Sequence, residues 1–370
     1  MDAPGWYAKL FQVTNGLVLG DLPLYQTPGG LIQINQQGNW TVSTPIGGGG
    51  GLKRDTLRSL TKGFRCGVAI CYGTGSGSDY VFQAGPILAA QLLQESPPIL
   101  QLGGSDPWAL LNATYLINPA SQSIVTYTSS MSGIAASIIN AAVARNPLPI
   151  DAATVTGTGA SRTYNWYDFT FAGAALQALT QAAGGPDVYF RPYFSDASHI
   201  RWQAVIGNPY ITQSGQPLLF DQGSNLVEIR PSIDSSRLAG VVYAKGNGVE
   251  AGTLSASATD PTLQAAGWPL LEATDSSQAN LTDLGALAAV AQGNLALNQR
   301  PVETWVSWVR TDKRHPLGTY GPGLFANYSM NTHPLIPPDR YSQRILGLSR
   351  NQGDDPGMVQ HVLHATQGSV

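Results

Sequence analysis

The five histidines of the chain are the first residues to test for catalytic or metal-binding chemistry. They are His199, His315, His333, His361 and His364. A zinc protease would place two histidines and a glutamate in a His-Glu-x-x-His helix, and the sequence has no such motif. His361 and His364 would share a face only on a helix, not on a strand. We therefore predict no metal site and no cofactor.

Serine and glycine motifs give no catalytic site either. The Gly-x-Ser-x-Gly elbow of serine hydrolases is absent. Two glycine-rich stretches, residues 47–51 and 73–77, lack the Gly-Lys-Ser/Thr that binds phosphate in a P-loop. The second stretch would also need a glycine at Ser78 to match the dinucleotide fingerprint. We interpret both stretches as loops.

Carboxylates and aromatic rings leave one further option, which is contact with sugars. A glycosidase needs two carboxylates at a set distance, and no such pair can be read from the five glutamates. We predict that the chain is not an enzyme.

The aromatic run at residues 164–169 could stack on sugar rings or pack in a core. Its candidate glycan contacts are Tyr164, Trp166 and Tyr167.

The composition favours a protein that buries surface against other subunits. The chain has 370 residues, of which 43% are hydrophobic and only 12% are charged. The usual charged share is about 25%. A surface rich in Ser, Thr, Asn and Gln is the simpler alternative. We favour assembly with other subunits over this alternative, because the centres of subunit interfaces are depleted of charged residues.

Charge and segment patterns exclude several other classes. The net charge is −3 and the five lysines are scattered, so specific nucleic-acid binding is not expected. No basic segment followed by an apolar run opens the chain, and no run of about 18 apolar residues occurs. Cys66 and Cys71 would be roughly 16 Å apart on one strand, whereas a disulfide needs about 7 Å or less. They are predicted to be buried thiols.

Hydrophobic periodicity predicts strands on both sides of one helical region. Alternating residues indicate strands at 6–13, 31–35, 39–43, 66–72 and 80–82, and later at 226–229, 238–244, 302–309 and 339–349. The strand 302–309 carries large apolar groups on both faces and is expected to be buried on both. A hairpin is predicted for 188–191 and 200–204 around the turn at 195–198. Helices are predicted at 52–61, 132–145, 171–183 and 282–298.

Two blocks of sequence are distinctive without carrying reactive groups. In residues 81–116 a strand, a Gly85-Pro86 break, a second strand, a Pro97-Pro98 break, a third strand, Gly103-Gly104 and a helical turn with Trp108 follow in order. Residues 225–250 place a polar connection at 234–237 between two strands. With the strands around Trp6 and the region 282–349, these blocks resemble, in order, the tail-hub proteins of tailed bacteriophages. The first resembles minor tail proteins of actinobacterial phages.

This resemblance implies a β-rich α+β fold with two tail-tube-like β-barrel or sandwich domains and an inserted helical region, forming a trimeric ring. We place the domains at residues 1–115 and 210–310, the insertion with its hairpin at 116–209, and strands that return to the first domain at 311–370. The helical part, 116–186, would lie on the outside. The protein would be a virion component at the distal end of the tail.

The resemblance also implies partners. The ring would be a homotrimer that joins the sixfold tail tube to threefold tip proteins. It would contact the distal tail or tail-tube protein, the tape measure protein and other tail-tip proteins, and DNA would pass without sequence-specific binding. Candidate interface residues lie in the glycine run and in the Ala-rich helix 282–298. They are Gly47, Gly49, Gly51, Leu284, Ala288 and Ala291. The alternative function is a receptor- or glycan-binding tail-tip protein.

Overall fold

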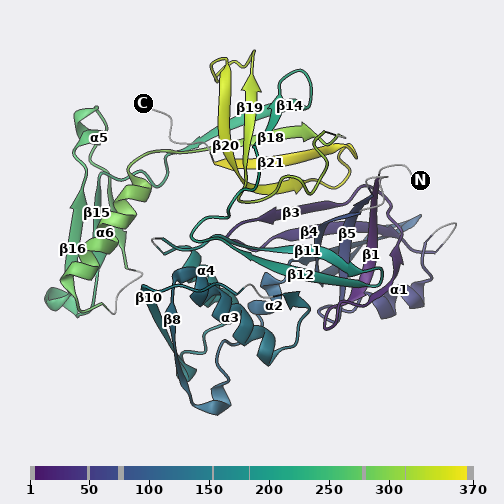
Figure 1. Ribbon diagram of the computed structural model, residues 1–370, viewed down its shortest axis with the longest axis horizontal. Helices are drawn as coiled ribbons and strands as arrows, with labels where there is room; N and C mark the ends of the chain where they lie inside the picture. Colours follow the sequence, from purple (N-terminus) through teal and green to yellow (C-terminus); the bar gives the residue numbers. More distant parts are fainter. Residues whose placement is uncertain are drawn as a thin grey trace. The chain divides into compact units, whose positions relative to one another are not determined.

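The computed structural model describes residues 5–47, 51–73, 79–151, 154–182, 184–276, 281–312 and 314–364 (Figure 1). Contacts between residues divide the chain into two units. Unit 1 contains Met1–Ile229 and Val306–Leu363, and unit 2 contains Arg230–Trp305 and His364–Val370. The predicted strand-rich α+β class is confirmed. The barrel and ring geometry and the four-part domain division remain predictions.

Unit 1 is built around one large sheet, which also includes the ends of two strands that lead into unit 2. The sheet has 13 strands in the order β14-β18-β21-β20-β3-β4-β7-β6-β5-β1-β2, with β19 beside β20 and β13 beside β19. Within it, β20 pairs antiparallel with β3, so a late segment of the chain joins an early one. The strands are β1 (Gly5–Gln12), β2 (Val18–Leu22), β3 (Gly29–Gln33), β4 (Asn39–Pro45), β5 (Cys66–Gly73), β6 (Tyr80–Glu95), β7 (Pro98–Ser105), β13 (Leu218–Asp221), β14 (Leu226–Asp234), β18 (Val302–Arg310), β19 (Phe325–Met330), β20 (Asp339–Arg350) and β21 (Met358–His364).

Strand β6 changes partner halfway along its length. It pairs with β5 as far as Pro86 and with β7 from Ile87 onward. The predicted break at Gly85-Pro86 is therefore wrong, because one strand of 16 residues runs through it. The two residues mark the change of partner instead. A Cβ at Gly85 would lie 1.6 Å from the Ser105 carbonyl oxygen, so only glycine fits there.

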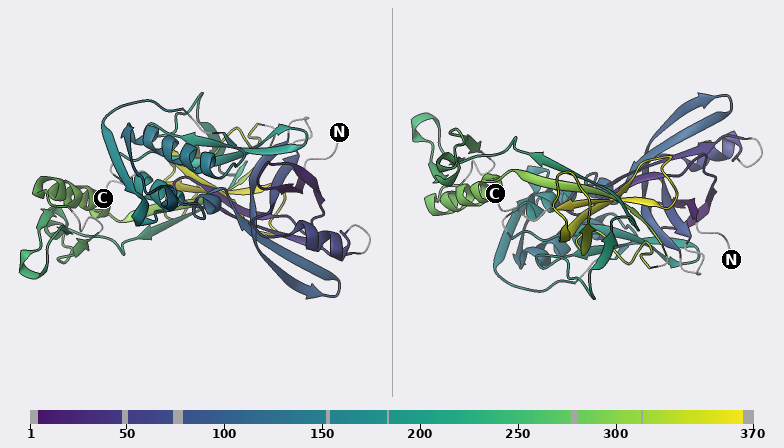
Figure 2. Two further views of the ribbon diagram at one scale, coloured as in Figure 1. Left: turned by 90° about the horizontal axis from the view of Figure 1, so that it is seen from below. Right: turned by 90° about the horizontal axis from the view of Figure 1, so that it is seen from above.

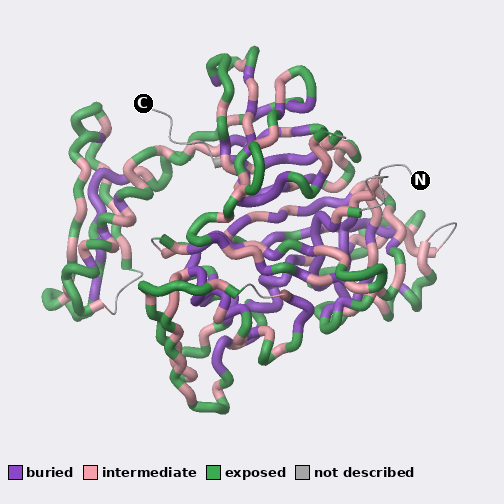
Figure 3. The backbone as a smooth tube through the Cα atoms, viewed as in Figure 1, coloured by how far each residue is buried: buried purple, intermediate pink, exposed green. Residues whose placement is uncertain are grey.

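The helical region packs on the strands of unit 1 through a large apolar core. Buried residues are purple in Figure 3. Ile134, Ile138 and Ala142 lie on one face of α3 and are fully buried, as their spacing predicts. The Ser130 hydroxyl accepts the Gly133 N–H at 3.1 Å and begins α3. The elements are α1 (Arg54–Leu60), α2 (Trp108–Leu111), η1 (Pro119–Ser121), β8 (Ile124–Ser129), α3 (Met131–Arg145), β9 (Ile150–Asp151), β10 (Ala160–Asn165), η2 (Trp166–Asp168), α4 (Ala172–Thr180), β11 (Val188–Asp196) and β12 (His199–Ile206).

The predicted hairpin is confirmed as β11 and β12, which pair antiparallel. Trp202 of this hairpin is fully buried, and its Nε1 donates to the Ala84 carbonyl of β6 at 3.1 Å. Its ring meets Phe11 of β1 edge-to-face at 5.6 Å between centroids. The tryptophan therefore joins the hairpin to the large sheet.

Unit 2 is a small sheet with a helix packed on it. Its strands lie in the order β16-β15-β17, and α6 packs on β15 and β16. Leu287 and Ala291 of the helix meet Ala244 of the sheet in a buried cluster. The Asp283 carboxylate accepts the Ala286 N–H at 2.6 Å and begins the helix. The elements are β15 (Val241–Lys245), η3 (Glu250–Gly252), β16 (Ser255–Thr259), α5 (Thr262–Ala265), β17 (Glu272–Asp275) and α6 (Leu284–Asn298).

Burial along β18 differs from the prediction. The face with Trp305, Ser307 and Val309 is buried, but Val302 is 42% exposed on the other face. The prediction that both faces are buried is wrong, because an antiparallel sheet can leave one face partly solvated. Cys66 and Cys71 are buried free thiols, as predicted.

Candidate functional site

The predicted interface residues lie in two places, and their side chains differ in accessibility. Leu284 is 53% exposed at the start of α6, and Ala288 is half-buried one turn later. Ala291 is fully buried in the core of unit 2, so its side chain is not available to another subunit. The outer side of α6 also exposes Ala289 and Leu297, the latter by 70%. No residue of Leu284–Asn298 is charged.

The residues at the two ends of the glycine run are joined by backbone contacts. Gly47 donates its N–H to the Leu52 carbonyl at 2.9 Å, and Ile46 forms a parallel bridge with Leu52. Gly47 has a φ of 66°, in the left-handed region that glycine adopts without strain. Gly51 lies close to the carbonyl oxygens of Gly47 and Pro45, where a Cβ would clash. Gly49 lies outside the described residues.

The predicted glycan contacts have unequal access to a ligand. Tyr164 lies beside Tyr127 with ring centroids 6.1 Å apart, and both pack against the core of unit 1. Burial raises the pKa of each phenol. Trp166 is also partly buried against this core, whereas Tyr167 is 54% exposed. Of the three predicted residues, Tyr167 presents the most accessible ring.

An aromatic stack next to these residues escaped the sequence analysis. The rings of Tyr115 and Phe171 are stacked with centroids 4.5 Å apart, and Phe169 meets Tyr115 at 5.9 Å. Phe169 is 52% exposed and has a φ of 47°, which is rare for a residue with a large side chain. A bridge between Tyr115 and Phe171 brings the two segments together. Tyr115 and Phe171 are more than 50 positions apart in the sequence, so no local sequence pattern indicates that their rings are in contact.

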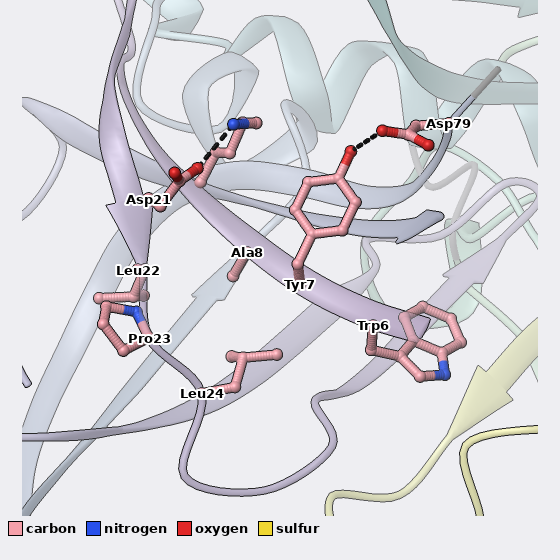
Figure 4. Close-up of a pocket in the computed structure, with 9 residues that line it drawn as sticks. Trp6, Tyr7, Ala8, Asp21, Leu22, Pro23, Leu24 and Asp79 are labelled. Atoms are coloured by element: carbon pink, nitrogen blue, oxygen red, sulfur yellow. Dashed lines mark hydrogen bonds and ion pairs between the residues drawn. The ribbon is translucent and has the colours of Figure 1, made fainter. Parts of the chain in front are cut away.

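A pocket beside β1 is lined by aromatic and charged side chains (Figure 4). Tyr7 donates its hydroxyl to Asp79 at 2.5 Å, and Lys9 forms an ion pair with Asp21 at 2.6 Å. Burial and the neighbouring carboxylate raise the pKa of Tyr7. Both carboxylates are thus engaged by side chains of β1. The arrangement binds strands together and does not present a pair of carboxylates for acid–base catalysis.

Two titratable groups are buried inside unit 1. Burial raises the pKa of Asp106 to about 7, although it accepts the N–H groups of Gly38 and Trp108 at 2.8 and 3.0 Å. Burial lowers the pKa of His361 to about 3. Its Nδ1 is 2.7 Å from the Tyr328 hydroxyl, and its Nε2 has no hydrogen-bond partner. Each group is enclosed by the fold, so neither can meet a substrate.

The described residues also give no candidate metal centre. No three side chains of His, Cys, Asp or Glu gather within them. His361 lies in strand β21, so the helix that would pair it with His364 is absent. No described helix is long and apolar enough to cross a membrane. Among the described residues, the outer side of α6 and the exposed rings of Tyr167 and Phe169 are accessible surfaces.

Comparison with known proteins finds likeness at the level of structure. No protein-family profile matches the chain, and no curated protein sequence matches it. The 43 kDa tail protein of prophage MuSo2 from Shewanella oneidensis matches over 98% of this chain and 98% of its own, with a TM-score of 0.62 and 12% identity. The tail protein from Neisseria meningitidis MC58 matches over 98% and 97%, with a TM-score of 0.55 and 12% identity. The chain has the fold of these tail proteins.

A third match comes from a larger protein. A chain of the Francisella PdpA–VgrG complex in its half-lidded form matches over 98% of this chain and 58% of its own length, with a TM-score of 0.51 and 10% identity. The matches to the two tail proteins extend over nearly the whole of both partners, so both units of this chain belong to the shared fold.

Proposed function

We propose that this protein is a structural component of a phage tail. The observation that carries the proposal is the fold likeness to two tail proteins over 97–98% of their length. The site chemistry agrees with it, because the carboxylates of the pocket beside β1 are engaged and the buried His361 is enclosed. In such a protein, function depends on interfaces and geometry.

Within the tail, we place the protein at the hub of the distal end, in the virion. Three copies form a ring of pseudo-sixfold symmetry from the two tube-like domains of each copy. The ring joins the sixfold tail tube to threefold tip proteins and surrounds the path of the tape measure protein and of DNA. The net charge of −3 supports passage of DNA without binding, because adhesion to phosphates requires clustered basic groups.

The subunit interface of this ring includes the outer side of α6. An uncharged helix with exposed Leu284 and Leu297 is poorly suited to face water along its whole length. Residues 47–51 contact a neighbouring tail protein. The mass of the purified protein in solution tests the trimer. Three copies of the 39.1 kDa chain are expected, and a monomer at every concentration would refute the trimer.

A second function, glycan binding at the tail tip, is favoured by the exposed aromatic rings. Tyr167 and Phe169 are both more than half exposed, and aromatic rings stack on the apolar faces of sugars. This function would use the helical region of unit 1 and is compatible with a place in the tail.

A further inference from the structure

The second half of β6 and the turn that follows it form an exposed arm. We define the arm as residues 88–97, all of which are exposed. In both views of Figure 2 this blue hairpin projects from the rest of unit 1. Leu88, Leu92 and Leu93 are 42%, 48% and 49% exposed. Scattered exposed leucines are common in proteins, but three exposed leucines within six positions make this arm unusually apolar for an exposed segment.

The arm has a free edge. Strand β6 leaves β5 at Pro86, and beyond this point its only neighbour in the described part of the sheet is β7. Natural proteins usually protect such an edge with charged side chains or prolines. Here Glu95 is the only charged residue between positions 80 and 105. Bulges at Leu88 and Leu93 interrupt the pairing with β7. A β-bulge changes the direction in which nearby side chains of the strand point.

The outer side of α6 matches this arm in length and in charge. Residues 88–95 span about 23 Å as a strand. The 15 residues of α6 span about 21 Å from the first Cα to the last. Between their ends both surfaces are uncharged and mostly apolar, and their exposed polar side chains include Gln91 and Gln94 on the arm and Gln292 on α6. Charges lie at their ends: Glu95 at the tip of the arm, the exposed Asp283 just before α6 and the exposed Arg300 just after it. Glu95 is attracted to the Arg300 end of the helix and repelled from the Asp283 end.

We infer that the arm of one copy packs along the outer side of α6 of a second copy, with Glu95 near Arg300. This inference rests on the proposed ring, and it adds which two surfaces of neighbouring copies are in contact. A contact between different surfaces of identical chains is heterologous, and it leaves no surface uncovered once the ring closes. A second copy is the occupant that the similar lengths and the attraction between Glu95 and Arg300 favour.

Chemical cross-linking between two introduced cysteines tests the contact. Leu92→Cys lies on the arm and Ala289→Cys on the exposed side of α6. The full-length double variant is treated with a short bismaleimide and run on a denaturing gel. Covalent dimers and trimers are expected from the double variant. Neither single variant should form them, because Cys66 and Cys71 are buried.

Assembly of arm variants gives a second readout. Leu92→Lys together with Leu93→Lys should raise the dissociation constant of the assembly by roughly tenfold or more, since two apolar side chains lose their buried contact. The matched control is Leu335→Lys, at a leucine that is 78% exposed elsewhere in unit 1. Circular dichroism should be unchanged in both proteins, because the substituted side chains are already exposed.

The outcomes separate this inference from the proposed function. A wild-type trimer whose double cysteine variant gives no covalent bridge overturns the arm contact and leaves the hub proposal standing. Bridging by Leu92→Cys alone would indicate contact between two arms and also overturn it. A wild-type protein that stays monomeric at all concentrations overturns both.

Discussion

The guanidinium of Arg350 lies over the ring of Trp6, with its Cζ 4.4 Å from the ring centroid. This contact joins the end of β20 to β1, the first strand of the chain. Arg350 is only 3% exposed. Its guanidinium donates to the carbonyl oxygens of Pro28 at 2.7 Å, Asp354 at 2.9 Å and Met358 at 3.3 Å. Burial lowers the pKa of Arg350, and the carbonyl dipoles compensate for its lost hydration.

Replacing Arg350 with lysine should therefore destabilise the protein. An ammonium group keeps the charge but cannot reach three carbonyls and stack on Trp6 as the planar guanidinium does. We expect a loss of about 2–4 kcal/mol in the free energy of unfolding, measured by urea denaturation. Arg340→Lys is the control, since Arg340 is exposed on the same strand. Equal stability of the two variants would contradict this role of Arg350.

The buried His361 should make stability depend on pH. Its pKa is about 3 in the folded protein and 6.5 without burial, so the unfolded chain binds more protons between these values. Above pH 6.5 His361 is neutral in both states and does not reduce the free energy of unfolding. As the pH falls from 6.5 toward 3, the free energy of unfolding decreases because only the unfolded chain binds the proton. One group contributes a slope of up to about 1.4 kcal/mol per pH unit.

The measurement is urea denaturation of wild type and His361→Gln at pH 7.5, 6.5 and 5.5. The glutamine offers a polar partner to the Tyr328 hydroxyl and does not titrate. We expect the wild type to lose about 1 kcal/mol more than the variant between pH 6.5 and 5.5. Parallel pH profiles for the two proteins would show that His361 does not couple protonation to unfolding.

Much of the secondary structure could be predicted because its signals are local. The helices predicted at 132–145 and 282–298 begin within two residues of α3 and α6, which Ser130 and Asp283 cap. The turn at Asp196 closes the predicted hairpin. The course of β6 could not be predicted. Pro86 usually interrupts a strand, and only the position of β7 shows that the strand continues while its partner changes.

The candidate surfaces also depend on packing that the sequence alone does not show. The helix α6 was expected at an interface from its composition, but only the packing of unit 2 shows that Ala291 is in its core and Leu284 outside. The stack of Tyr115 on Phe171 joins residues distant in sequence. The exposure of the arm depends on which edge of β6 is left free, and that is a property of the whole sheet.

A charge on α6 should disrupt the assembly without unfolding the subunit. Ala288 is half-buried beside the exposed side of the helix, so Ala288→Arg places a charge in an otherwise uncharged surface. We expect the trimer to be lost in solution while the circular dichroism spectrum is kept. Ala197→Arg, in the exposed turn between β11 and β12, should remain trimeric. A trimer formed by Ala288→Arg would count against α6 as an interface.

The glycan-binding function predicts saturable binding to cell-wall polysaccharide of a susceptible host. Replacing Tyr167 and Phe169 with alanine should weaken this binding at least tenfold, because stacking needs the exposed rings. Trp166→Ala should have a smaller effect on binding, since its ring is partly buried against the core. Tyr25→Ala, at a tyrosine that is 53% exposed elsewhere, is the matched control. Loss of binding in the control alone would contradict the assignment of the site.

Electron microscopy of the purified full-length protein, with class averaging, tests the central proposal most directly. The account predicts rings with threefold symmetry and an open centre wide enough for a DNA duplex. Particles the size of one 39.1 kDa chain at every concentration, with or without tail-tube protein, would contradict the hub proposal.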